Sequence, residues 1–260
     1  LDENDGISVV TLVHSETSTA TACDLKTIAS IVGKTDALLL VDGITSVGAM
    51  PVEMDAWGVD VLVTGSQKAM MLPPGLGFVG LGPRAVKRLE DVPADNLYNL
   101  DLRKWLASYN KNDVPFTPPV SLIRGQRVAL ELIEEEGLEN VWSRCAALAK
   151  GTRAAFEAMG LKLLSHSPSD SVTGAYYPDG IDDSAFRKAT RENHGVHLAG
   201  GQNGRLGDIK GMVFRISHMG YVDAADTVAG LYAVESEFLA AGASIRPGAA
   251  IPAFMKAISE

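Results

Sequence analysis

The chain has 260 residues, of which 46% are hydrophobic, and its formal net charge is −9. This length is enough for a sizeable core and two modest lobes, and the acidic balance argues against nucleic acid and anionic membrane surfaces as partners. No stretch is apolar for long enough to span a bilayer, and the two cysteines, Cys23 and Cys145, lack the spacing of a metal site. We therefore expect a cytoplasmic protein with reduced cysteines, no metal centre and small-molecule partners.

The chain opens on a predicted strand, Ile7–His14, whose residues are mostly β-branched and apolar. The polar cluster Ser15–Thr19 follows, and the hydroxyl of Thr17 within it suits an ST-turn or a helix cap. Asp24 is then expected to cap a helix that runs to Val32 with one apolar face.

The next two predicted strands each end in a residue that can carry chemistry. Asp36–Asp42 ends in a carboxylate, and Val61–Val63 is followed shortly by Lys68, before the chain turns at Pro73-Pro74-Gly75. In an α/β sheet, ligands bind at the carboxyl ends of strands. A restrained, partly desolvated amine suits a Schiff base, and a carboxylate suits the protonated nitrogen of a pyridinium cofactor. The alternatives are a lysine that points into water and an aspartate that caps a helix or a turn.

The middle of the chain contains one irregular stretch between regular elements. A turn element, a strand and a short basic helix are expected at Met54–Val59, Phe78–Leu81 and Pro83–Leu89, and Asp91–Pro119 is expected to be irregular. Helical periodicity then runs from Val120 to Met159, interrupted only at Gly137. We therefore predict two long helices with a lobe boundary near Gly137, so that residues 1–136 form one domain and residues 137–260 another.

The C-terminal part alternates short strands with helices, as is typical of a small α+β lobe. The glycine-rich stretch Ala199–Gly211 lacks the order and context of a phosphate-binding loop, and we interpret it as a flexible connection. The expected strands are Leu161–Leu164, Val172–Tyr177 and Met212–Ile216, and the expected helices are Asp182–His194 and Val222–Ala241.

Arg215 lies in a short β run between apolar neighbours. A buried guanidinium needs a partner, because an unpaired buried charge is costly. That partner is either a nearby Asp or Glu or a substrate carboxylate, whose two oxygens match the guanidinium fork. His218 has no nucleophile to pair with, and we interpret it as structural.

Three stretches in this order, LVDGITSVGAMPVEMD, VLVTGSQKAMMLPPGLGFV and FRISHMGYVD, resemble the class V aminotransferases that use pyridoxal phosphate. Within that class the chain is most similar to the alanine/serine–glyoxylate (serine–pyruvate) branch. The resemblance implies the α/β fold of PLP-dependent transferases (aspartate aminotransferase-like, fold type I), with a mainly parallel sheet in the large domain and a small C-terminal α+β domain. It also implies that roughly the first third of the polypeptide, with the phosphate-anchoring loop and the ring-stacking aromatic residue, lies upstream of Leu1.

The resemblance implies a role for each residue at the strand ends. Lys68 would form the Schiff base with pyridoxal 5'-phosphate, and Asp42 would pair with its ring nitrogen. Ile44 would pack on the ring, Gln67 would bind the phosphate, and the hydroxyl of Thr17 would contact the ring oxygen. The alternatives are ordinary core packing for Ile44 and a solvated turn amide for Gln67.

Two further residues receive roles from the resemblance. Arg215 would bind the substrate α-carboxylate, and Thr117 would contact the phosphate in the other subunit of a homodimer. The alternative for Thr117 is a residue in a proline-stiffened loop. Relatives in this branch have a tyrosine near Thr117, where this chain has Val114, so that second phosphate contact is not expected here.

The predicted function is PLP-dependent transamination of alanine or serine with glyoxylate or pyruvate. The first alternative is another amino donor, such as aspartate, which would need a second cation. A cysteine desulfurase-type lyase is disfavoured, because both cysteines fall in apparent helices and a Ser-Gln pair before Lys68 replaces the histidine of those enzymes. The third alternative is an inert fragment that lacks the phosphate-anchoring segment.

Overall fold

The computed structural model describes residue 4 and residues 6–93, 96–204 and 207–260, and it divides into two compact units. Each unit is built from three segments of the chain. Unit 1 consists of Leu1–His14, Asp24–Ile44 and Val52–Leu132, and unit 2 of Ser15–Cys23, Thr45–Pro51 and Ile133–Glu260. The division into domains of residues 1–136 and 137–260 remains a prediction.

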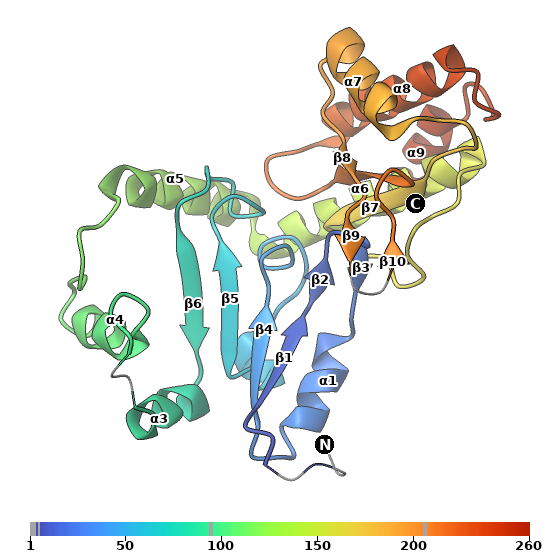
Figure 1. The fold of residues 1–260 in the computed structure, drawn as a ribbon. Coiled ribbons are helices and arrows are strands. Elements are labelled where there is room, and N and C mark those ends of the chain that lie inside the picture. Colours follow the sequence, from blue (N-terminus) through green and yellow to red (C-terminus); the bar gives the residue numbers. More distant parts are fainter. Residues whose placement is uncertain (1–3, 5, 94–95, 205–206) are drawn as a thin grey trace. The chain divides into compact units, whose positions relative to one another are not determined.

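Unit 1 is organised around a four-stranded sheet with the order β1-β4-β5-β6 (Figure 1). The strands β1 (Val9–Val13), β4 (Leu38–Asp42) and β5 (Val61–Gly65) are parallel, and β6 (Gly77–Leu81) is antiparallel to β5. Asp42 is in register with Val13 on one side and with Val63 on the other, so the three parallel strands end at the same edge. The predicted α/β fold with a mainly parallel sheet is confirmed, with β6 as the exception.

One face of this sheet is covered by α1 (Leu25–Val32) and α2 (Met54–Trp57). The carboxylate of Asp24 accepts the backbone N–H of Thr27, which is the predicted cap of α1. Because both helices present apolar residues toward the strands, their side chains form a single cluster with those of β4. The buried members of this cluster are Leu25, Ala29, Val32, Ala37, Leu39, Val41 and Val59.

The stretch Asp91–Pro119, expected to be the least regular of the chain, contains one helix that was not predicted, α4 (Leu102–Tyr109). Asp101 caps this helix by accepting the backbone N–H of Arg103. The surrounding stretch is rich in Asp, Asn and Pro, and these residues obscured the helical period of so short an element. The helices α3 (Pro83–Asp91), α5 (Val120–Glu136) and α6 (Leu138–Met159) lie where they were expected, and Gly137, with φ +86°, separates the last two.

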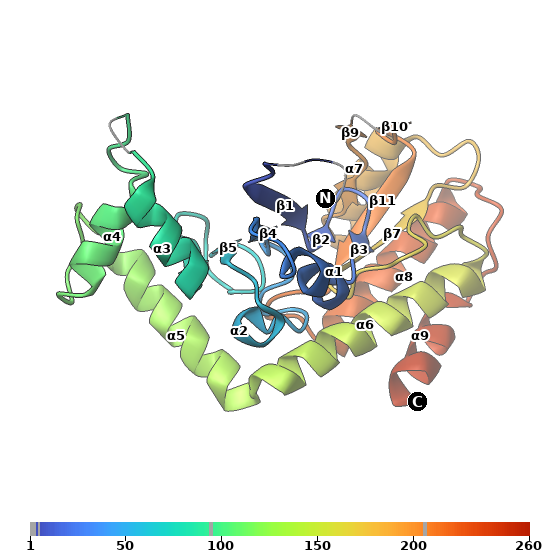
Figure 2. The same cartoon turned by 90° about the horizontal axis from the view of Figure 1, so that it is seen from below.

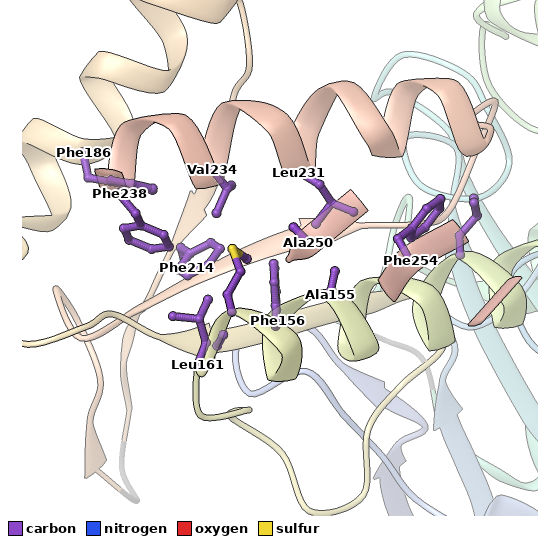
Figure 3. Packing of buried hydrophobic residues seen from close by; sticks show 13 residues of the cluster. Ala155, Phe156, Leu161, Phe186, Phe214, Leu231, Val234, Phe238, Ala250 and Phe254 are labelled. Carbon is purple, nitrogen blue, oxygen red and sulfur yellow. The ribbon is translucent and has the colours of Figure 1, made fainter. Parts of the chain in front are cut away.

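Unit 2 contains a three-stranded antiparallel sheet with the order β7-β11-β8. Its strands are β7 (Val172–Tyr176), β11 (Val213–Ser217) and β8 (Ala199–Gly200). They pack against α6, α7 (Asp183–His194), α8 (Ala224–Ala240) and α9 (Ala250–Ser259), and α9 lies along α6 (Figure 2). Aromatic side chains fill the core between these elements, among them Phe156, Phe186, Phe214, Phe238 and Phe254 (Figure 3).

Several expectations for unit 2 are corrected by the structure. The predicted strand Leu161–Leu164 is reduced to a single bridge between Leu163 and Ala175. The stretch Ala199–Gly211 is not simply a flexible connection, because it contains β8, which pairs with β11. It also contains a small hairpin of β9 (Asn203–Gly204) and β10 (Gly207–Asp208), and residues 205–206 lie outside the described residues. Two-residue strands have no periodicity that a sequence can show, so only tertiary pairing reveals them.

In the part of the chain that the structure describes, none of the helices combines the length and apolarity needed to cross a bilayer.

Candidate functional site

The carboxylate of Asp42 lies at the carboxyl edge of the sheet in unit 1 and is half-buried. Its Oδ1 accepts the backbone N–H of Ile44 at 2.9 Å, so Asp42 does take the turn role that the sequence left open. Oδ2 accepts no hydrogen bond from the described residues. The turn therefore orients the carboxylate and leaves one oxygen for a ligand.

Gly65, the last residue of β5, allows two of the candidate side chains to converge. A Cβ atom at this position would lie 2.9 Å from Ile44 Cδ1 and 2.9 Å from Gln67 Oε1, and real Cβ atoms do not approach so closely. The bare backbone of Gly65 leaves room for Ile44 from the end of β4 and for Gln67 from the turn after β5 in these positions. Three predicted cofactor residues, Asp42, Ile44 and Gln67, are thus gathered at one edge of unit 1.

Lys68 lies in the turn that follows β5, at the same edge, and is half-buried. Its carbonyl accepts the backbone N–H of Met71 at 3.0 Å. Met71 has φ +60°, which is unusual for a residue other than glycine, and such backbone strain clusters at functional sites. The lysine is therefore held in a tight, locally strained turn and not in an open loop.

Arg215 lies on β11 in unit 2, and only 8% of its surface is exposed. Its Nε and Nη2 donate to the carbonyl oxygen of Gly200 at 3.1 and 2.7 Å, and its Nη1 donates to the carbonyl of Thr17 at 2.6 Å. Burial lowers the pKa of the guanidinium from its ordinary value, and the charge of Glu16 opposes this shift. None of the described carboxylates forms an ion pair with Arg215, so the acidic partner that the sequence left open is not found.

The hydrogen bonds to described residues use only some of the N–H groups of the Arg215 guanidinium. It has five N–H groups, and the contacts to Gly200 and Thr17 use three of them, one each on Nε, Nη1 and Nη2. Among the described residues, one N–H on each terminal nitrogen therefore has no acceptor. Two donors on neighbouring nitrogens match the two oxygens of a carboxylate.

Thr17 is brought to Arg215 through its backbone, not through its hydroxyl. It lies in the turn between β2 (Ser15–Glu16) and β3 (Thr21–Ala22), which pair as a short hairpin. No hydrogen bond of the Thr17 hydroxyl occurs among the described residues, so neither an ST-turn nor a cap occupies it. The hydroxyl remains available for the contact that the resemblance implies.

Thr117 is separate from the strand-edge residues. It is exposed, in the connection that leads into α5, and no described residue hydrogen-bonds to its side chain. The neighbouring Phe116 ring packs against Tyr98 and Trp105, with centroid distances of 5.3 and 5.8 Å, and this contact anchors the connection. The role of Thr117 in a second subunit stays a prediction.

Cys145 and His218 are buried and do not provide acid–base or nucleophilic groups. His218 is buried, its Nε2 lies 2.9 Å from Thr173 Oγ1, and burial lowers its pKa to about 3. The thiol of Cys145 donates to the His218 carbonyl at 3.2 Å, and burial raises the pKa of this thiol to about 11. Cys23 lies between β3 and α1, so its assignment to a helix is wrong. The inert, neutral Cys145 is unsuited to persulfide chemistry.

Sequence reasoning missed the part played by Gly200 and by Ser66. The Gly200 carbonyl receives two donors of Arg215, and Ser66 closes the loop that carries Lys68. In the sequence, Gly200 is one glycine in a glycine-rich stretch, and Ser66 is a serine directly after a strand. Both signals are too common to be read without coordinates.

Comparison with known proteins gives a consistent result. Residues 3–227 match the model of the family described as Aminotransferase class-V. The chain is 39% identical over 257 residues to the L-aspartate–glyoxylate aminotransferase of Paracoccus denitrificans, covering 97% of this chain and 64% of that protein. It is also 39% identical over 240 residues to the serine–glyoxylate aminotransferase of Arabidopsis thaliana, covering 90% of this chain and 59% of that protein.

Among solved structures, the crystal structure of pyridoxamine–pyruvate aminotransferase from Mesorhizobium loti is similar with a TM-score of 0.90 and 34% identity. The match covers 97% of this chain and 65% of that chain. The chain thus spans less than two thirds of the length of each of these relatives.

Proposed function

The chain belongs to the class V aminotransferase family, and from this premise we propose that the whole protein transfers an amino group from a small amino acid to a 2-oxo acid. The donor is alanine or serine, and the acceptor is glyoxylate or pyruvate. Relatives carry the names serine–glyoxylate aminotransferase and pyridoxamine–pyruvate transaminase, which support a small 2-oxo acid as the acceptor. The family implies pyridoxal 5'-phosphate as the cofactor.

The observation that carries the proposal is the buried guanidinium of Arg215, which forms no ion pair within 4.0 Å with any described residue. Burying a charge without an anion is costly, and here backbone carbonyls satisfy only part of the group. One N–H on each terminal nitrogen remains for the α-carboxylate that every amino acid and 2-oxo acid substrate shares. A structural arginine would be expected to meet a carboxylate of the protein itself.

The residues at the strand edge fit the cofactor. Gly65 lets Ile44 and Gln67 converge, and Asp42 keeps one free oxygen beside them. Pyridoxal phosphate, when bound, supplies an electron sink for the bonds at the substrate Cα. Asp42 Oδ2 would hold a proton on the ring nitrogen, and Ile44 would pack on the ring face.

The remaining groups bind and transfer protons. Lys68 Nζ would hold the cofactor covalently and, once released, would carry the proton from the substrate Cα. The amide of Gln67 would bind the phosphate, and the hydroxyl of Thr17 would bind the ring oxygen. Arg215 would orient the substrate so that the bond to be broken faces the ring.

Replacing the lysine tests the cofactor assignment. Lys68→Ala should abolish the visible absorption band of the bound cofactor, because the only amine assigned to hold it is removed. Lys111→Ala, at an exposed loop position, is the matched control and should keep the band. A visible band that persists in Lys68→Ala would refute the assignment of Lys68.

The amino donor has one competing candidate. The similar protein of Paracoccus denitrificans is named L-aspartate–glyoxylate aminotransferase, which favours aspartate. Arg215 accounts for one carboxylate, and a dicarboxylate would need a second cation. A panel of amino donors against glyoxylate, measured with the whole protein, decides between them, since aspartate turnover above that of alanine and serine would replace our first choice.

Two further proposals concern the whole protein. It forms a homodimer in which Thr117 reaches the phosphate of the other subunit, and it works in the cytoplasm. The aromatic contacts that anchor the connection around Phe116 support the former, and the sequence expectation of cysteines without metal spacing supports the latter.

A further inference from the structure

The loop of residues 66–76, which we call the lysine loop, carries Lys68 and is closed at its ends by Ser66. The backbone N–H of Ser66 donates to the Leu76 carbonyl at 3.0 Å, and the Leu76 N–H donates to Ser66 Oγ at 3.2 Å. Ser66 Oγ donates to the Pro73 carbonyl at 2.8 Å, and the Leu72 N–H donates to the Ser66 carbonyl at 3.0 Å. Every polar group of Ser66 therefore bonds to another residue of the same loop.

Ser66 makes more hydrogen bonds within the lysine loop than a serine in a simple turn requires. The residue is fully buried, with 0% of its surface exposed. Its hydroxyl acts as donor and acceptor at once and joins two points of the loop, Pro73 and Leu76. Lys68 lies two positions away on one arm, and its own carbonyl is held by the Met71 N–H. The backbone on both sides of Lys68 is thus tied.

A second anchor comes from the first part of α5. The amide Nε2 of Gln126 donates to the Met70 carbonyl at 3.1 Å, and Gln126 is only 4% exposed. The other end of this amide, Oε1, is buried without a hydrogen-bond partner among the described residues. An unsatisfied buried acceptor costs stability. The burial of Gln126 is therefore explained better by its hydrogen bond to Met70 of the lysine loop than by a contribution to the stability of the fold.

Close backbone approach seats the loop on the same helix. A Cβ at Gly75 would lie 2.5 Å from Leu122 Cδ1, and a Cβ at Gly125 would lie 2.8 Å from Leu72 Cδ1. The ends of Leu122 and Leu72 thus pack against the bare backbone of a glycine on the opposite side, and a larger residue at Gly75 or Gly125 would require these side chains to shift.

We propose that Ser66 is a positioning residue for Lys68, with Gln126 as its second anchor. The hydroxyl of Ser66 keeps the lysine loop closed, and the closed loop presents the Lys68 amine in a fixed place at the end of β5. The catalytic consequence rests on the proposed function, whereas the closure of the loop does not. A rigid supporting shell of this kind is what precise placement of a reactive group requires.

The first experiment uses the chain without cofactor. Trypsin cleaves after lysine, so the rate of cleavage of the Lys68–Ala69 bond reports how often the lysine loop opens. In Ser66→Ala we expect cleavage about tenfold faster, because two hydrogen bonds of the hydroxyl are lost. Hydrogen exchange at the Leu72 and Leu76 amides should accelerate in parallel, while cleavage after Lys111 serves as an internal reference.

The matched control is Ser46→Ala. Ser46 is also 0% exposed, but none of the described residues hydrogen-bonds to its hydroxyl, so this variant loses the same atom at the same burial without opening the loop. Equal cleavage after Lys68 in wild type and Ser66→Ala would overturn the proposal. Should Ser66→Ala not fold, Gln126→Leu removes the second anchor alone, and an unchanged rate there would overturn it as well.

A second experiment adds pyridoxal phosphate to the whole protein. Ser66→Ala should acquire the visible band at least about tenfold more slowly than wild type, and Ser46→Ala at the wild-type rate. If the wild type acquires no band at all while the loop of Ser66→Ala opens faster, the proposed function fails and the closure stands. If the band forms equally fast in both although the loop has opened, Ser66 does not position Lys68, and the proposal fails.

Discussion

At the scale of single residues, the decisive finding is how the guanidinium of Arg215 is satisfied. Two backbone carbonyls, of Gly200 and Thr17, orient it without neutralising its charge. A carboxylate in their place would have occupied the N–H donors that the proposed substrate carboxylate would need. Carbonyl partners thus fix the direction of the guanidinium and keep its affinity for an anion.

Replacing Arg215 by lysine should separate the contribution of the planar guanidinium from that of the positive charge. Lysine keeps the positive charge but has no planar fork, so Arg215→Lys should raise KM for the amino donor by about 10- to 100-fold, with a smaller effect on kcat. Arg153→Lys is the control, because Arg153 already pairs with Asp170 at 3.2 Å. Steady-state kinetics of the whole protein measures both, and an unchanged KM in Arg215→Lys would argue that Arg215 is structural.

Buried His218 should make stability depend on pH. In the folded chain its pKa is about 3, against 6.5 ordinarily, so between these values the unfolded chain binds the extra proton. Folding stability contributed by this group is therefore complete above pH 6.5 and is lost as the pH falls toward 3, by about 1.4 kcal/mol per pH unit.

His218→Gln tests this dependence, since the glutamine amide can still bond to Thr173 and does not titrate. Urea unfolding between about pH 4 and pH 6.5 should show a shallower loss of stability in the variant. His14, whose pKa is also lowered by burial, acts in the same direction in both proteins and cancels in the comparison. Identical pH slopes would show that His218 does not resist protonation in the folded state.

At the scale of elements, helix contacts in unit 2 depend on where glycine is placed. A Cβ at Gly151 of α6 would lie 2.5 Å from Phe254 Cδ2 and 2.7 Å from Ile258 Cγ2, both on α9. Phe254 is fully buried and cannot move aside. Gly151 is therefore a contact point between two helices, even though glycine weakens the helix that contains it.

Two glycine-to-alanine variants should change stability in opposite directions. Gly151→Ala should lower the free energy of unfolding by about 1–3 kcal/mol through overpacking, less the gain in helix propensity. Gly230→Ala in α8, where a Cβ would meet nothing within 4 Å, should raise it by about 0.5–1 kcal/mol. Denaturant unfolding measures both, and stabilisation by Gly151→Ala would show that α6 and α9 can separate at no cost.

At the scale of the whole molecule, the length of the chain bears on cofactor binding. The chain spans 64% and 59% of the two curated relatives described above. Phosphate binding at helix N-termini supplies much of the affinity for such a cofactor, and none of the helix N-termini among the described residues is assigned to the phosphate here. In the proposed function, the strand-edge residues would hold the ring and the reactive carbon, and only Gln67 is assigned to the phosphate of the same subunit.

We therefore predict that the 260-residue chain binds pyridoxal phosphate weakly, whereas a polypeptide of the relatives' full length binds it at least about tenfold more tightly. Titration of both with cofactor, followed by the visible band, measures the two affinities. Equal affinity would show that the residues of this chain suffice to bind the phosphate.

The sequence by itself determined the parts whose signals are local. Apolar runs that stop at polar residues located the ends of β4 and β5, and with them Asp42 and Lys68. The aspartate before α1 and the glycine between α5 and α6 marked helix limits. These features are decided by residues a few positions apart, so hydrophobic period and capping chemistry are sufficient to predict them.

Only the tertiary structure decided which groups meet. Arg215 contacts carbonyls 15 and 198 positions away in the chain, and Ser66 bonds across its loop to residues 7 and 10 positions on. Every residue has the same backbone carbonyl, so the sequence does not indicate which carbonyl will accept a hydrogen bond from Arg215 or Ser66. Whether Arg215 forms an ion pair or keeps N–H donors available for a ligand therefore depends on which groups folding brings within hydrogen-bond distance.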